Sequence, residues 1–391
     1  MFDLNRSQQQ IQAAARKFAR GEFDPGLGFE ENRKFPEKIW KKAATLGFLG
    51  IQFSESYSGG DLGLLEASLV AESFCRVDSS MGIALTQAGI GSEMIFRFGQ
   101  DTLKEKILPQ LCEGHLTSAI AFSENFHGMD VSAINTRADF TKNRIVINGN
   151  KTHVADRGTQ GGYLVLCQTG PKQGEVEGDP SKTLSLMWVE QDQQGLSISD
   201  AGLKFATNMV KSVDLTLDNV TVPAANLVGK QGDGLGLLEH FYDEIKIVTA
   251  AQALGIAQGA LDLALGYVKQ RQQFNRKLCV FQITRHKIAQ MVTKIEQARL
   301  ITYKAAHLFD RGKKDTGLIS MAKMAACRAA VEVSDEAIQL FGGYGYMKES
   351  RVEQFFRDAK MTELLFGNPM AQKDIICDAL LGKVKHKRKD T

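Results

Sequence analysis

The sequence predicts an α+β protein that is mainly helical, because helical patterns occupy both ends of the chain and strand patterns occupy its middle. A chain of 391 residues is long enough for two or three packed units. Strands and helices do not alternate along it, which argues against a parallel sheet of βαβ units. We expect an N-terminal helical domain over residues 1–115, a middle β-barrel or β-sandwich domain over 116–230, and a C-terminal four-helix bundle over 231–391.

The expected helices are recognised by apolar residues at intervals of three and four. Near the N-terminus this pattern is carried by Ile11, Ala14, Ala15 and Phe18. A longer amphipathic pattern in the last third of the chain runs through Ile288, Met291, Val292, Ile295 and Ala298. It ends near Gly312, a residue type typical of helix C-termini. Long helices of this kind pack most simply as an antiparallel bundle.

In the middle of the chain apolar residues alternate instead. Ile145 and Ile147 would share one face of a strand, and the pair Asn148-Gly149 directly after them is typical of a hairpin turn. The segment from Val213 to Leu217 alternates in the same way. These patterns predict a small β-domain between the two helical regions.

Composition argues against several classes of protein. The formal net charge is +3, and basic residues are not interleaved with aromatic ones, so we expect no nucleic-acid partner. No apolar run approaches the roughly 20 residues of a membrane-spanning helix, and the features of a secretion signal are missing. Six scattered cysteines and seven histidines without paired spacing predict neither disulfides nor a metal site. We therefore expect a cytoplasmic protein with reduced thiols.

The most informative motif lies near the C-terminus. The segment QLFGGYGYMKE, from Gln339 to Glu349, is followed by Arg357-Asp358-Ala359-Lys360. This combination resembles the C-terminal signature of the acyl-CoA dehydrogenases. Five other blocks occur in the order that this family shows: Glu55–Gly63, Ser123–Asp130, Ile147–Lys151, Val222–Gly229 and Arg271–Gln282. The resemblance therefore covers nearly the whole chain.

The resemblance implies a flavin cofactor, FAD, held in extended form between the β-domain and the C-terminal helices of two subunits. A homotetramer or homodimer is implied with it. Arg271 and Phe274 would contact the cofactor of the partner subunit, Arg271 through bidentate bonds to the pyrophosphate. Gln339, Gly342 and Gly343 would lie along the adenosine end, where glycines let the backbone approach closely.

Around the flavin ring the sequence departs from the family pattern. Ser123 is an acceptable substitute for the hydroxyl residue that the family places near the ring. His153 and Ala155 stand where an aromatic residue commonly shields the ring and a hydroxyl contacts its redox-active nitrogen. Asn368 replaces a polar residue that commonly contacts the cofactor. His153 also has a simpler interpretation, as a partly buried histidine with satisfied hydrogen bonds.

The largest departure concerns the catalytic base. In active members a carboxylate removes the α-proton of an acyl-CoA thioester while the β-hydrogen leaves as hydride. Ungapped alignment of the C-terminal motif puts that position at Phe366, whose phenyl ring accepts no proton. Some members carry the glutamate on the first long helix of the C-terminal domain, at a position that matches Ile245. Glu244 lies about 100° around the helix from it, so it is either an unorthodox base or a paired or solvated carboxylate.

The resemblance also implies contacts with acyl-CoA. The backbone N–H of Phe366 would hold the thioester oxygen, and this donor survives a change of side chain. Asp243 matches a position that contacts the CoA chain, Lys246 replaces a usual arginine, and we include their neighbour Tyr242 in the same group. Met129 replaces a serine that helps to bind acyl-CoA.

The acyl chain itself would end against the segment from Met81 to Gly91. Small and apolar residues there indicate room for a medium or long chain, although the same residues also serve helix packing.

Two functions remain open at this point. The first is a flavin-dependent acyl-CoA dehydrogenase that has an unorthodox base and passes electrons to an electron-transfer flavoprotein. The second is a catalytically inactive acyl-CoA-binding sensor or regulator on the same fold, with or without FAD. The breadth of the resemblance favours the first. The combination of Phe366, Met129 and Ala155 favours the second.

Overall fold

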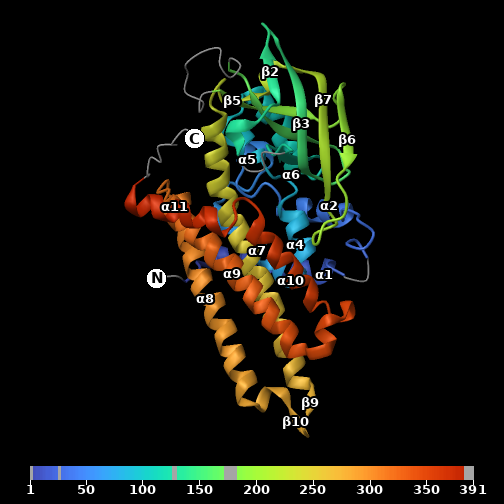
Figure 1. The fold of residues 1–391 in the computed structure, drawn as a ribbon, viewed down its shortest axis with the longest axis vertical. Coiled ribbons are helices and arrows are strands. Elements are labelled where there is room, and N and C mark those ends of the chain that lie inside the picture. Colours follow the sequence, from blue (N-terminus) through green and yellow to red (C-terminus); the bar gives the residue numbers. More distant parts are fainter. Residues whose placement is uncertain (1–2, 25–27, 126–129, 171–182, 383–391) are drawn as a thin grey trace, which may run out of the picture. The chain divides into compact units, whose positions relative to one another are not determined.

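The computed structural model describes residues 3–24, 28–125, 130–170 and 183–382 (Figure 1). The chain forms two compact units. The first comprises residues 1–20, 63–82 and 243–391, and the second comprises residues 21–62 and 83–242. Helices dominate the first unit, and a sheet with its surrounding helices makes the second. The predicted fold class, mainly helical with one β-region between two helical regions, is confirmed.

The first unit is built almost entirely from helices. Its main elements are α1 (Arg6–Glu22), α3 (Leu64–Val77), α7 (Gly234–Gln270), α8 (Gln282–Asp310), α9 (Thr316–Phe341), α10 (Val352–Leu364) and α11 (Pro369–Leu381). A two-stranded hairpin of β9 (Gln272–Gln273) and β10 (Arg276–Lys277) follows α7. In Figure 1, α8 and α9 run side by side. The predicted amphipathic helix that ends near Gly312 is α8.

The second unit contains the sheet. Its helices are α2 (Glu37–Thr45), the second half of α4 (Ser79–Thr86), α5 (Ser92–Phe98) and α6 (Asp101–Cys112). Its strands are β1 (Thr117–Ala121), β2 (Arg137–Phe140), β3 (Arg144–Asp156), β4 (Gly161–Gln168), β5 (Leu184–Glu190), β6 (Leu196–Asp200), β7 (Lys211–Pro223) and β8 (Leu227–Val228). They are ordered β6-β7-β3-β2-β4-β5-β8, with β1 paired to β4.

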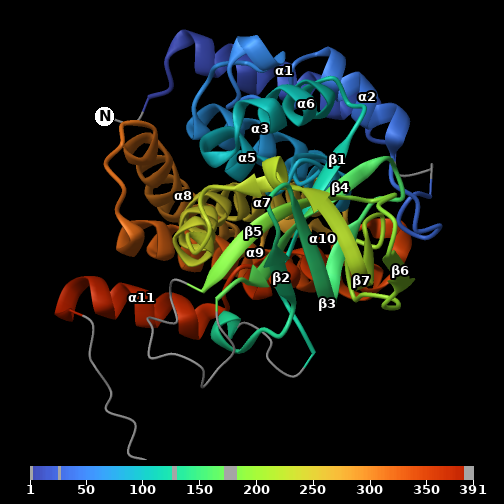
Figure 2. The same ribbon diagram turned by 90° about the horizontal axis from the view of Figure 1, so that it is seen from above.

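This sheet is open and does not form the closed barrel that we considered as one alternative. Figure 2 shows β3 between β2 and β7, the two strands to which it is hydrogen-bonded. Strands β3 and β7 form the longest pairing in the sheet.

The predicted hairpin turn at Asn148-Gly149 is wrong. Strand β3 continues through both residues, and its register against β7 shifts between Ile147 and Gly149. Gly149 has a φ of +147°, and a Cβ there would lie 2.6 Å from the Cα of Thr136. The glycine therefore serves a β-bulge and a close approach of two backbones, for which the local sequence looks the same as for a turn.

Helix α7 is long and apolar enough to cross a membrane, but 78% of its most apolar window is buried inside the protein. We interpret it as the core helix of the C-terminal region.

The N-terminus of α3 is capped by a residue that is distant in sequence. The backbone N–H groups of Leu64 and Leu65 donate to the Asp310 carboxylate at 2.7 and 3.0 Å. Asp310, the last residue of α8, thus provides hydrogen-bond acceptors for the free backbone N–H groups at the start of α3.

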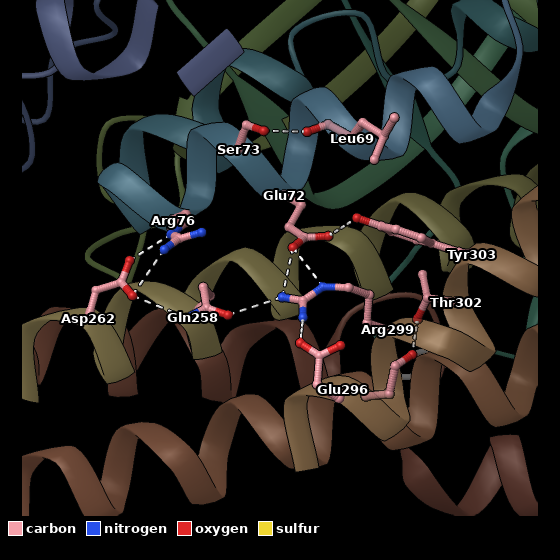
Figure 3. Close-up of polar contacts among 11 residues, drawn as sticks. Leu69, Glu72, Ser73, Arg76, Gln258, Asp262, Glu296, Arg299, Thr302 and Tyr303 are labelled. Atoms are coloured by element: carbon pink, nitrogen blue, oxygen red, sulfur yellow. Dashed lines mark hydrogen bonds and ion pairs between the residues drawn. The ribbon is translucent and has the colours of Figure 1, made fainter. Parts of the chain in front are cut away.

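A buried polar network joins α3, α7 and α8 (Figure 3). Glu72 is 1% exposed, and its carboxylate accepts hydrogen bonds from Arg299 Nε at 3.1 Å and from Tyr303 Oη at 2.7 Å. Arg299 also bonds Gln258 at 3.1 Å, while Arg76 forms a bidentate pair with Asp262. The carboxylate is thereby neutralised without contact with bulk water.

We expect Glu72→Gln to lower the free energy of unfolding of the first unit by about 3 kcal/mol, because it removes the charge that compensates a buried guanidinium. Urea unfolding would measure the change. Glu296→Gln is the matched control, since Glu296 also pairs with Arg299 but its side chain is 56% exposed. The control should cost less than about 1 kcal/mol. Equal losses in the two variants would contradict the role given to Glu72.

Candidate functional site

The turn between α10 and α11 holds Phe366 in an unusual backbone conformation. Phe366 has a φ of +53° and Gly367 a φ of +99°. The carbonyl of Gly367 accepts two hydrogen bonds, from Lys323 Nζ at 2.7 Å and from Gln372 Nε2 at 3.0 Å. Both donors are about 1% exposed. A bulky residue persists at positive φ only where its surroundings over-determine it, as these two bonds do here.

Directly after Gly367, the same turn is held by the N-terminal cap of α11. The Asn368 side chain accepts from the backbone N–H groups of Met370 and Ala371 at 3.0 and 3.1 Å, which starts α11 with Pro369 in its first turn. The oxygen of Asn368 is therefore engaged in capping.

Four consecutive residues on α7 are buried in the first unit. Asp243, Glu244, Ile245 and Lys246 are each at most 4% exposed. Asp243 forms an ion pair with Lys314 at 2.7 Å and accepts from Thr316 Oγ1 at 3.4 Å. Asp243 and Lys246 are three residues apart and share one helix face, whereas Glu244 is rotated away from both. The aligned position Ile245 is apolar, so only Glu244 offers a carboxylate next to it.

The charge around Lys246 is mostly positive. Burial lowers the pKa of Lys246, Asp243 opposes that effect, and Lys323 and Lys314 add to it. Burial also lowers the pKa of Lys323. Three lysines lie in this group, with Asp243 near Lys246 and Lys314 and with Glu363 near Lys323. The lysines suit an anionic ligand or a developing negative charge.

At the far end of α7 a set of exposed groups is gathered. The guanidinium carbon of Arg271 lies 5.7 Å from the ring centre of Tyr344. Phe274 is 85% exposed at the tip of the β9–β10 hairpin. Gly342 has a φ of +62°, and a Cβ added to it or to Gly343 would meet no other atom of the described chain within 4 Å. Exposed rings, a guanidinium and open glycine backbone are suited to a nucleotide and its phosphates.

In the second unit a buried ion pair fixes the segment around Ser123. The Glu124 carboxylate accepts from Lys151 Nζ at 2.8 Å, from the backbone of Asn135 at 2.6 Å and from the backbone of Thr136 at 2.9 Å. Lys151 is 1% exposed. Burial alone would raise the pKa of Glu124, but Lys151 and these hydrogen bonds bring it below its ordinary value. Ser123 is held directly beside this pair.

Strand β3 brings His153 and Ala155 near Ser123. The backbone N–H of Thr152 donates to the carbonyl of Ser123 at 2.9 Å, and the register of β3 against β7 shifts between Lys151 and Val154. Within this irregularity His153 has a φ of +55° and an exposed side chain, whose Nδ1 lies 3.3 Å from Ser212 Oγ. Ala155 has no hydrogen-bonding group in its side chain. Position 153 therefore offers an imidazole, and position 155 offers no hydroxyl.

Tyr242, in the part of α7 that belongs to the second unit, packs its ring edge against Phe122 at 5.9 Å. Its hydroxyl is buried and has no hydrogen-bond partner within the described ranges of the chain. Burial raises the pKa of this hydroxyl. A buried hydroxyl in this state is suited to a polar group of a ligand.

Three family models match the chain in succession: the N-terminal domain of acyl-CoA dehydrogenase over residues 5–115, the middle domain over 119–220 and the C-terminal domain over 232–381. An acyl-CoA dehydrogenase from Bacillus subtilis is 34% identical, covering 97% of this chain and 99% of that protein. The chain belongs to the acyl-CoA dehydrogenase family. An acryloyl-CoA reductase (NADH) from Anaerotignum propionicum is also 34% identical, covering 96% of this chain and 94% of the relative.

A solved structure of this family, the butyryl-CoA dehydrogenase of Megasphaera elsdenii, is 31% identical with a TM-score of 0.91. The match covers 97% of this chain and 100% of that one. Membership of the acyl-CoA dehydrogenase family, expected from the C-terminal motif, is thus confirmed.

The residues predicted for the site fall into three local groups within the two units. Ser123, His153 and Ala155 come together in the second unit, and Arg271 lies close to the segment of Gly342 and Gly343 in the first. Asp243 to Lys246 share one helical turn. Gln339 is exposed near the end of α9. Met129 lies outside the described residues. The roles of all these residues in this acyl-CoA dehydrogenase relative remain predictions.

Four residues that hold the site were not predicted as such: Glu124, Lys151, Lys323 and Gln372. Glu124 and Lys151 appeared in the family-like blocks without a role, and their pairing spans 27 positions. The hydrogen bond from Lys323 to Gly367 joins residues that are 44 positions apart in the sequence. A charged residue inside an otherwise apolar pattern was the only available signal.

A cavity of about 350 Å³ lies elsewhere in the second unit, between α6 and the loops at Gly158–Gly161 and Glu190–Asp192. None of the residues predicted for the site lines it. It therefore does not bear on the acyl-CoA or flavin contacts.

We expect Lys151→Met to destabilise the second unit most at neutral pH and least in acid. In the wild type the folded-state pKa of Glu124 is depressed, so its carboxylate stabilises the fold above its ordinary pKa, and that contribution is lost as pH falls through the folded pKa. Without Lys151, burial dominates, so the ionised Glu124 costs about 3 kcal/mol at neutral pH, and protonation relieves this cost as pH falls. Denaturation midpoints between pH 3 and 7 would show this. Lys106→Met, which removes an exposed partner of Glu190, should leave the profile unchanged.

Proposed function

We propose that this family member binds acyl-CoA thioesters but lacks the orthodox base for their dehydrogenation. The observation that carries the proposal is the turn at Phe366. The positive φ, the two bonds to the Gly367 carbonyl and the cap at Asn368 keep a backbone geometry suited to hold a thioester oxygen through the Phe366 N–H. The side chain at that place accepts no proton. In this proposal, the turn supplies the donor for the thioester oxygen and supplies no proton acceptor.

The electropositive environment of α7 supports the same proposal. Lys246 lies near Asp243, Lys314 and Lys323, and an acyl-CoA brings negatively charged phosphates and a thioester oxygen that gains charge when polarised. We propose Asp243, Lys246 and Tyr242 as substrate contacts, and a medium or long acyl chain.

We also propose that the protein holds FAD, which when bound would accept a hydride. The exposed Arg271, Phe274 and Gly342-Gly343 fit the pyrophosphate and adenosine of a cofactor shared with a second copy, so a homotetramer or homodimer is part of the proposal. Ser123 offers a hydroxyl for the ring. Ala155 offers none, so the flavin ring would have fewer hydrogen bonds than the family pattern provides. We place the protein in the cytoplasm.

A second candidate function is dehydrogenation with Glu244 as the base and an electron-transfer flavoprotein as the electron acceptor. It is favoured by one observation, the burial of Glu244 at 2% exposure on the same turn of α7 as Ile245. The rotation of Glu244 away from the face of Asp243 and Lys246 argues against it.

We expect hexanoyl-CoA to raise the thermal midpoint of the wild-type protein more than free CoA does, because the thioester adds its own contacts in the folded state. A ligand at 100 times its Kd adds about 2.7 kcal/mol. In the flavin-loaded wild type, hexanoyl-CoA should leave the flavin absorbance unchanged. Rapid bleaching that is lost in Glu244→Gln would instead establish the second candidate. No stabilisation by any acyl-CoA would refute both.

We expect Phe366→Glu to supply the missing base. In the flavin-loaded variant, hexanoyl-CoA should bleach the flavin at least about 100-fold faster than in the wild type, the usual scale of general-base catalysis. Stopped-flow absorbance would measure the rate. Phe366→Gln is the matched control, since it has the same size as glutamate and accepts no proton. Equal rates in the two variants would show that position 366 is not beside the α-carbon.

A further inference from the structure

The cavity of about 350 Å³ in the second unit has a volume in the range of pockets that hold small ligands. It lies between α6, the β3–β4 loop at residues 158–161 and the segment 190–192 at the end of β5. All three segments belong to the second unit. A ligand in this cavity would therefore contact one unit only, apart from the groups proposed to hold acyl-CoA and flavin.

The backbone of the β3–β4 loop is held by hydrogen bonds to two neighbouring segments. The carbonyl of Gln160 accepts from the backbone N–H of Thr117 at 3.0 Å, and the carbonyl of Gly161 accepts from the backbone N–H of Gln191 at 3.0 Å. A Cβ on Gly161 would lie 2.5 Å from the carbonyl oxygen of Thr117, so this close approach needs a glycine. The wall of the cavity is thus set by the fold, and little would have to be ordered when a ligand binds.

Part of the cavity wall is aliphatic. Ile107 of α6 is 1% exposed, and Leu116, which follows that helix, is 5% exposed. Among the described residues, no aromatic side chain lines the cavity. A nucleobase would find no ring to stack on, whereas a methylene chain would be matched by these two side chains.

The charged groups of the cavity include one carboxylate without a partner. Lys106 of α6 forms an ion pair with Glu190. The carboxylate of Asp192 forms neither an ion pair nor a hydrogen bond within the described part of the chain. Two carboxylates and one ammonium group make the lining negative overall, which favours a cationic ligand over an anion such as a phosphate.

Amide side chains add acceptor oxygens to this lining. Nε2 of Gln110 donates to the carbonyl of Lys106 at 2.6 Å, and its Oε1 has no partner within the described ranges. The side-chain amides of Gln160 and Gln191 form no hydrogen bond within those ranges either. A primary ammonium group has three N–H donors and no acceptor, so it complements a carboxylate surrounded by amide oxygens.

We propose that this cavity binds a small aliphatic ammonium ligand, of which a diamine is the simplest case. Its cationic group pairs with Asp192, and its methylene chain lies along Ile107 and Leu116. An aliphatic amine carries its positive charge at neutral pH. A neutral chain of the same length would leave Asp192 without a counter-charge, and a dicarboxylate would be repelled. The proposal does not depend on acyl-CoA binding.

Isothermal titration of the full-length protein with three matched five-carbon ligands tests this. Cadaverine should bind about 10- to 100-fold more tightly than pentanediol, its neutral analogue, the range of a hydrogen bond between charged groups. Glutarate, the corresponding dicarboxylate, should bind more weakly than the diol. Equal affinities for cadaverine and the diol, or no binding of cadaverine, would overturn the proposal.

Two variants should change the affinity for cadaverine in opposite directions. Asp192→Asn should lower it about 10-fold because it removes the unpaired charge, and Lys106→Met should raise it because it frees Glu190 from its ion pair. Both substituted side chains are exposed, so we expect both variants to fold.

Glu105→Gln is the matched control. It removes an exposed carboxylate from α6, next to Lys106, that does not line the cavity, and it should leave the affinity for cadaverine unchanged. Equal losses in Asp192→Asn and Glu105→Gln would show that cadaverine responds to the general surface charge, and would overturn the proposed site.

Discussion

The carboxylate of Glu72 is the constraint on which the packing of the C-terminal helices depends. At 1% exposure it is stable only with a positive charge and a hydrogen-bond donor beside it. Arg299 and Tyr303, four residues apart on α8, supply both (Figure 3). Apolar helix faces can pack against each other in several arrangements. The hydrogen bonds of Glu72 with Arg299 and Tyr303 form in only one of these arrangements. We infer that these bonds set the register of α8 against α3, and Asp310 at the end of α8 then reaches the N-terminus of α3.

The position of α8 in turn affects the position of α9, which carries Lys323. Helix α9 packs along α8, and the Nζ of Lys323 fixes the carbonyl of Gly367 (Figure 1). Lys323, Gln372 and Asn368 therefore hold the turn that contains Phe366. None of these hydrogen bonds uses the side chain of Phe366.

The sequence predicts some of these features better than others. Helices such as α8 follow from an apolar spacing of three and four, which is a local property. The bulge at Asn148-Gly149 has the sequence of a turn because both need a glycine with positive φ. The clamp of Glu124 and Lys151 and the bond of Lys323 to Gly367 were not predictable, since each joins positions that only the folded chain brings together. The family resemblance predicted the site residues, but it did not predict the hydrogen bonds and ion pairs that hold them in place.

Under the proposed function, the charges of the first unit would allow binding without proton removal. Lys246, Lys314 and Lys323 would stabilise an oxygen that becomes negative, and the Phe366 N–H would add a fixed donor to it. These groups would act on the thioester whether or not a base is present. Proton removal needs an acceptor beside the α-proton, and the phenyl ring of Phe366 is apolar surface in place of a charge. A phenyl ring in place of a carboxylate leaves the proposed site with one negative charge fewer, which favours an anionic ligand.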